Sequence, residues 1–186
     1  MLARRQVLAP VVVLALAGAG AVMWLSRAPE PLVPLAVETL VPPTGIDLPA
    51  HVIAGGDDGK AFSLDAPVEG HLGETMYTVP LDAPPAISSV GVSWVPAEGP
   101  YRSLDAFTDW QRRHPEDSQV VGEPVVEHSA LGAAVRKDLV MTAGVTITQW
   151  AVQHGDDLYL VEWVHPPDDE TWRPTVEAMI ASWHWG

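Results

Sequence analysis

An unbroken apolar run from Val7 to Leu25 follows Arg4 and Arg5 directly. At about 1.5 Å per residue, a helix of this length just crosses a hydrocarbon core, and the arginines favour a cytoplasmic N-terminus. A basic start, an apolar stretch and alanines at 17, 19 and 21 also describe a cleavable signal peptide, although the apolar run continues beyond those alanines. The pattern predicts a signal-anchor or a signal peptide over residues 1–27, with the rest of the chain outside the cytoplasm.

Prolines follow this run at positions 29, 31, 34, 42 and 43. Because proline fixes φ and lacks a backbone donor, residues 28–50 are predicted to form an extended spacer rather than a helix. Residues 51–186 then form one extracytoplasmic domain, since they suffice for one hydrophobic core and are few for two.

Polar and apolar residues alternate with a period of two in several segments of this domain. Val90, Val92 and Trp94 fall on one side and the residues between them on the other, as in a strand with one packed face. The breaks at 142–144 and 154–157 are short enough for tight turns, which join antiparallel strands. The predicted strands are 62–65, 76–81, 89–94, 134–141, 145–153 and 158–165.

Helical spacing appears twice. Leu104, Phe107 and Trp110 recur after Ser103, whose hydroxyl can cap a helix that ends before Pro115. The second helix ends the chain, with Thr171 as its expected cap because Pro174 must lie in the first turn. Its apolar stripe is Trp172, Val176, Met179, Ile180 and Trp183.

The order strands, helix, strands, helix predicts an α+β fold in which helices flank an antiparallel β-sheet, after one N-terminal transmembrane or signal helix. Three segments carry a family resemblance: Phe62–Pro67, Ser103–Phe107, and the stretch from Tyr159 through Pro166 and Trp172 to Trp183. Over residues 60–184 the chain resembles the PsbP-like α/β/α sandwich, whose bacterial members include LpqN-type lipoproteins and DcrB-type envelope proteins. The resemblance implies a non-catalytic binding, assembly or accessory module without shared enzymatic residues. Its motifs are packing motifs, so they indicate the fold more than the function.

The charge and the lack of cysteine limit which partners and which membrane anchor the chain can have. The three arginines before residue 29 belong to the N-terminal segment. The exported part therefore contains seven basic and 24 acidic residues, a formal charge near −17. Such a surface disfavours nucleic acid. The chain has no cysteine, which removes disulfides, thiol chemistry and the lipidated cysteine of LpqN-type relatives. The apolar segment would have to replace that lipid anchor.

No spacing nominates a catalytic, cofactor-binding or metal-ligating residue, and no cofactor is expected. His165 with Asp168–Glu170 is a weak metal candidate beside its plainer role at a helix start, and Gly55–Gly59 lacks the ligand pattern of a calcium loop. The adjacent His128 and Ser129 point to opposite faces of an extended strand and cannot act as a base and nucleophile pair.

The chain is unusually rich in tryptophan, and seven of its eight tryptophans lie after the apolar run. Indole rings on an open sheet face can grip a sugar or a peptide. Both faces of the last predicted strand are partly apolar, so either helices cover both or one face binds a partner. The candidate binding surface is Trp150, Tyr159, Trp163 and Trp185, with Trp185 the best candidate for an exposed contact.

These features predict a membrane-tethered or secreted non-catalytic domain that binds or assists another cell-envelope or secretion component. Its partners would be a protein or envelope component, and the membrane through the N-terminal segment. The alternative is an envelope hydrolase or metal-dependent enzyme whose carboxylates converge only in the fold.

Overall fold

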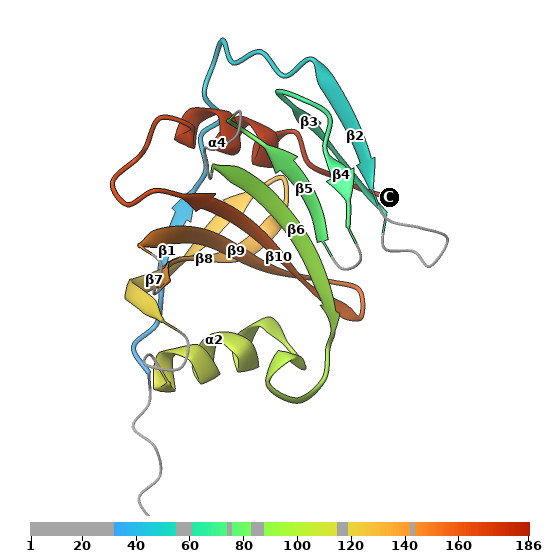
Figure 1. Cartoon of the computed structure of the whole chain (residues 1–186). Helices are drawn as coiled ribbons and strands as arrows, with labels where there is room; N and C mark the ends of the chain where they lie inside the picture. The colour runs from blue at the N-terminus through green and yellow to red at the C-terminus, as the bar shows by residue number, and fades with distance from the viewer. Residues whose placement is uncertain (1–31, 55–60, 74–75, 83–87, 115–118, 142–143) are drawn as a thin grey trace, which may run out of the picture. The chain divides into compact units, whose positions relative to one another are not determined.

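A computed structural model describes residues 32–54, 61–73, 76–82, 88–114, 119–141 and 144–186 (Figure 1). The chain divides into two compact units, Met1–Val33 and Pro34–Gly186, and the features below belong to the second. The signal or anchor helix predicted over residues 1–27 lies outside the described residues. Within the ranges given above, no helix is long and apolar enough to cross a membrane.

Most of the described strands belong to one eight-stranded sheet with the order β1-β7-β8-β9-β10-β6-β5-β4. Its centre is built from long neighbours in sequence, β7 to β10, joined by tight turns in which Gly132 and Gly155 adopt positive φ. β10 then pairs antiparallel with β6, with Val161 opposite Val92. The strands are β1 (Ala36–Thr39), β4 (His71–Leu72), β5 (Met76–Pro80), β6 (Ser89–Pro96), β7 (Val120–Ser129), β8 (Gly132–Met141), β9 (Val145–His154) and β10 (Asp157–His165).

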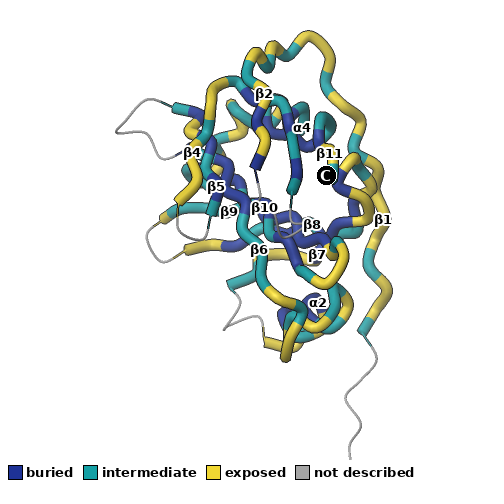
Figure 2. Tube along the Cα trace, turned by 90° about the vertical axis from the view of Figure 1, so that its right-hand side faces the viewer, coloured by how far each residue is buried: buried dark blue, intermediate teal, exposed yellow. Residues whose placement is uncertain are grey.

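β1 makes the large sheet mixed rather than antiparallel. It lies within the segment predicted as a spacer, yet it pairs in parallel with β7, Ala36 opposite Val125 and Thr39 opposite His128. All four of its residues are exposed, and β1 forms the outer edge (Figure 2). Only pairing with a distant strand defines this element, since a parallel neighbour must come from elsewhere in the chain.

A second sheet of three strands has the order β11-β3-β2, formed by β2 (Ala50–Ala54), β3 (Phe62–Ala66) and β11 (His184–Trp185). The end of the chain closes it, since Trp185 pairs with Phe62. Val52, Phe62 and Leu64 bury their side chains in the main core. This sheet therefore brings the C-terminal residues beside the first strands of the domain.

Two α-helices lie in the described part of the chain, α2 (Leu104–Arg113) and α4 (Arg173–Ala181), besides a short 3-10 turn η1 (Gly99–Tyr101). The predicted cap of α2 is confirmed, because the Ser103 hydroxyl accepts a hydrogen bond from the Ala106 amide at 3.1 Å. The predicted cap of α4 is wrong. Trp172 occupies that position without a side-chain hydrogen bond, while the Thr171 amide donates to Asp169 in the preceding turn.

Each face of the large sheet is covered by different elements (Figure 1). α4 and the small sheet lie on one side, here called the α4 face, and enclose the main core. α2 lies on the opposite side, the α2 face, over a smaller cluster of Phe107, Ala151 and Leu158. Alternation along β10 sends Tyr159, Val161 and Trp163 to the α4 face and Leu158 and Leu160 to the α2 face.

The predicted fold class is wrong. Strands account for 51% of the described residues and helices for 16%, so the domain is mostly β, with a large mixed sheet in place of an antiparallel α+β arrangement. Two causes are visible. The helices have only nine or ten residues each, and the proline-rich segment hides β1, whose parallel pairing has no local signal.

Candidate aromatic binding site

Aromatic side chains form a continuous series through the α4 face. Phe62 stacks on Trp183 with ring centroids 4.4 Å apart, and Trp183 meets Trp185 edge-on at 5.2 Å. Trp185 contacts Tyr159 at 4.8 Å, and Tyr159 in turn contacts Trp94 at 6.1 Å. Offset and edge-on contacts at these spacings add stabilisation to that of the buried area. The series thus links the small sheet to β10 and β6.

The series reaches solvent at one corner, which we call the aromatic corner: Trp94, His154, Tyr159 and Trp185. Trp185 stacks on His154 with centroids 4.1 Å apart and planes 5° from parallel, and its indole donates to the Leu131 carbonyl at 3.2 Å. Trp94, His154 and Trp185 are partly exposed, whereas Tyr159 is buried. At the corner, Trp94, His154 and Trp185 are therefore held by neighbouring rings and remain partly open to solvent.

The four residues of the predicted binding surface lie on the α4 face, but at different depths. Trp150, Tyr159 and Trp163 are each at most 1% exposed, and only Trp185 is partly open. Trp150 donates to Glu127 at 2.7 Å and Trp163 to Ser88 at 3.2 Å. In this conformation a partner reaches the predicted surface only at Trp185.

Two residues of the corner, Trp94 and His154, were not among the predicted site residues. Trp94 stood in a predicted strand, and its pairing opposite Tyr159 follows from the register between β6 and β10. His154 stood in a predicted turn. Nothing in the local sequence places it under Trp185, because that stack depends on β11 returning to the small sheet.

An ionic network lies farther along the α4 face. Arg136 on β8 pairs with the buried Glu127 on β7 and with the exposed Glu38 on β1, each at 2.8 Å. On α4, Arg173 stacks over Trp163 and pairs with Glu177 at 4.0 Å. Burial is the main cause that raises the pKa of Glu177. The carboxylates that converge here each have a cationic partner, so the network ties α4 and β1 to the sheet.

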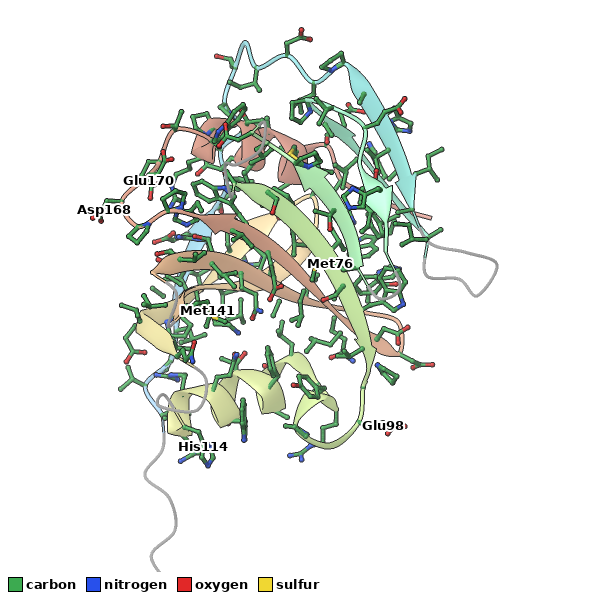
Figure 3. All side chains as sticks on the ribbon, viewed as in Figure 1. Met76, Glu98, His114, Met141, Asp168 and Glu170 are labelled. Carbon is green, nitrogen blue, oxygen red and sulfur yellow. The ribbon has the colours of Figure 1, made fainter. Side chains whose placement is uncertain are left out.

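The weak metal candidate does not form a site. His165 is buried, stacked on Trp163 at 3.9 Å and 3.3 Å from the Thr148 hydroxyl. Asp168 and Glu170 point outward from the loop before α4 (Figure 3), and Glu170 accepts a hydrogen bond from Arg173. Among the described residues, no three His, Cys, Asp or Glu side chains are grouped to hold a metal ion. The Gly55–Gly59 turn lies outside the described residues.

His128 and Ser129 are adjacent near the end of β7. The Ser129 hydroxyl accepts a hydrogen bond from the Leu131 amide at 3.2 Å, within the turn between β7 and β8. His128 is exposed on β7. Consecutive strand residues face opposite sides of the sheet.

No protein-family model and no curated relative matches the chain. Two solved structures show remote similarity, each with a TM-score of 0.39. One is a Bacteroides thetaiotaomicron protein, 15% identical, matched over 67% of this chain and 45% of its own, so this chain spans less than half of it. The other is LpqN of Mycobacterium tuberculosis, described as involved in cell envelope biogenesis, 12% identical, matched over 72% and 87%. These values do not confirm the PsbP-like architecture and assign no function.

Proposed function

We propose that the chain is a membrane-tethered or secreted, non-catalytic domain of the cell envelope that binds another envelope or secretion component through the aromatic corner. The observation that carries the proposal is the partly exposed stack of Trp185 on His154. Rings already held in place lose little conformational freedom on binding, and tryptophan is enriched among residues that dominate binding energy.

The N-terminal sequence supports the location. The apolar run from Val7 to Leu25, with arginines before it, is typical of a signal-anchor or signal peptide. Without cysteine, the chain has no lipoprotein acylation site that could retain it instead. The excess of acidic residues favours a partner other than nucleic acid.

The rival class, a hydrolase or metal-dependent enzyme, would bring several carboxylates or histidines together at an open site. The carboxylates around Arg136 are paired, and Glu127 also accepts a hydrogen bond from Trp150. These contacts hold β1, β7 and β8 together, which gives the carboxylates a structural role. The aromatic corner, with open rings, supports binding better.

Capture from crosslinked membranes tests the proposal with three versions of the full chain: wild type, Trp185→Ala and Trp110→Ala. Trp110 is a matched control, because it is also partly exposed but lies on α2, away from the corner. A partner recovered by wild type and Trp110→Ala and lost with Trp185→Ala supports the corner. Equal recovery by all three folded proteins refutes it.

Membrane fractionation followed by N-terminal sequencing tests the tether. An intact N-terminus in the membrane fraction supports an anchor. A mature chain beginning at Gly20 or Val22 shows cleavage and leaves the secreted form.

A further inference from the structure

Lys137 on β8 lies buried between the α2 face and α2, with 4% of the residue exposed. Its Nζ sits 4.3 Å from the centroid of the Phe107 ring and donates a hydrogen bond to Gln111 Oε1, and both of these residues belong to α2. No carboxylate of the described residues lies within ion-pair distance of Lys137. A buried ammonium without such a partner opposes folding, because desolvation disfavours the charged form.

Across the strands, Lys137 begins a polar row that ends at Glu162. Lys137 faces Gln149 on β9, which faces Glu162 on β10, and the Gln149 amide donates to Glu162 at 2.5 Å. Gln149 is 4% exposed, and its Oε1 has no hydrogen-bond partner in the described part of the chain. This row places polar side chains under α2 where apolar packing would be expected. Water could form the hydrogen bonds that these buried groups lack.

Further polar contacts join both ends of α2 to the sheet. At its start, the Leu104 amide donates to Gln153 of β9 at 3.3 Å. At its end, Arg112 pairs with Glu123 of β7 at 3.3 Å, and Glu123 is well exposed. Between them, Phe107 is the buried apolar anchor. The cluster beneath α2 is separate from the main core, so release of α2 would leave the core on the α4 face covered.

We propose that α2 is a proton-sensitive lid, with Lys137 as the latch: taking up a proton there favours release of α2 and exposure of the apolar cluster around Leu158 and Ala151. In the closed state Lys137 is held without a carboxylate partner, and in the open state water solvates its ammonium. This device is independent of the aromatic corner, which lies on the opposite face.

The groups around Lys137 set the direction of the effect. Gln111 and Phe107 of α2 and Gln149 of β9 do not titrate, Arg112 is paired with Glu123 of β7, and Glu162 of β10 attracts the ammonium. Burial outweighs Glu162 and lowers the pKa of Lys137 from 10.5 to about 7. Opening therefore takes up a proton between about pH 7 and 10.5. The ratio of open to closed lid should rise by up to about tenfold per pH unit lowered in that range, by about fiftyfold from pH 9 to pH 7, and level off below pH 7.

Thiol labelling tests the lid, because the chain contains no cysteine that would interfere. Leu158→Cys places a single thiol under α2, and Val161→Cys places one on the same strand under the α4 face, where Val161 is 1% exposed. Labelling rates are divided by those of the urea-unfolded protein at each pH, which removes the titration of the thiol itself. The lid predicts faster labelling at 158 than at 161, and a rise of about fiftyfold at 158 from pH 9 to pH 7.

Lys137→Met in the Leu158→Cys background should abolish that pH dependence, while Arg102→Met, which removes an exposed cation near the same helix, should preserve it. Lys137→Gln serves as a second neutral variant should the methionine variant fail to fold. Equal labelling at 158 and 161 at every pH would show global unfolding and overturn the lid. A pH dependence that persists in both neutral variants would overturn the role of Lys137.

Discussion

Replacing Arg136 by methionine should destabilise the domain far more than removing its exposed partner. Arg136 pairs with Glu127, whose side chain is 7% exposed, and with Glu38, whose side chain is 52% exposed. Losing the cation leaves the Glu127 carboxylate buried with only the Trp150 indole as donor. Breaking a buried pair from one side costs about 3–5 kcal/mol, and because Arg136 is partly exposed we expect about 3 kcal/mol. Glu38→Gln should cost less than about 1 kcal/mol.

Urea unfolding, followed by tryptophan fluorescence and circular dichroism, measures both losses. With a typical dependence on urea, a loss of 3 kcal/mol lowers the midpoint by about 1–3 M. The double variant Arg136→Met/Glu127→Gln should recover most of that loss, because a neutral amide at 127 needs no cation and can still accept from Trp150. The reasoning fails if Arg136→Met costs no more than Glu38→Gln, or if the second substitution restores nothing.

Three further predictions concern single residues. Ser103→Ala removes the α2 cap and should cost about 1 kcal/mol in urea unfolding, and an unchanged midpoint would contradict the capping role. Gly132→Ala forces a side chain at φ 105° and should cost more than about 1 kcal/mol, whereas a neutral or stabilising effect would show that the turn relaxes. Because burial raises the pKa of Glu177, its ionised form opposes folding, so Glu177→Gln should gain stability relative to wild type as the pH rises from about 4 to 7. A difference that is constant across this range would refute that account.

The elements predictable from the sequence are those with a local cause. Alternation and tight turns locate β6, β8, β9 and β10, and Ser103 with its apolar spacing locates α2. β7 has a weaker local signal, because Gly122 and Pro124 interrupt its alternation where its pairing with β8 shifts register. β1 carries no alternation of burial and is defined only by its partner.

The sequence predicts which residue types form the candidate site better than it predicts which of them are exposed. Tryptophan on alternating positions predicted aromatic clusters on a sheet face, but burial and binding leave the same pattern. Tertiary packing decides between them: Trp163 lies under Arg173 of α4, whereas Trp185 is left at the margin. Lys137 gave no sequence signal either, since the residue that opposes it across the interface, Gln111, comes from another element.

If the N-terminal segment anchors the chain as proposed, tension would enter the domain at β1, the first strand among the described residues. It runs parallel to β7, so a pull along its axis from the N-terminal side loads its hydrogen bonds together in shear rather than one after another. The Arg136–Glu38 pair adds a lateral tie at the same place. Under such a pull, we expect the lifetime of the folded domain to follow the rate at which β1 slips from β7 rather than the equilibrium stability of the whole fold.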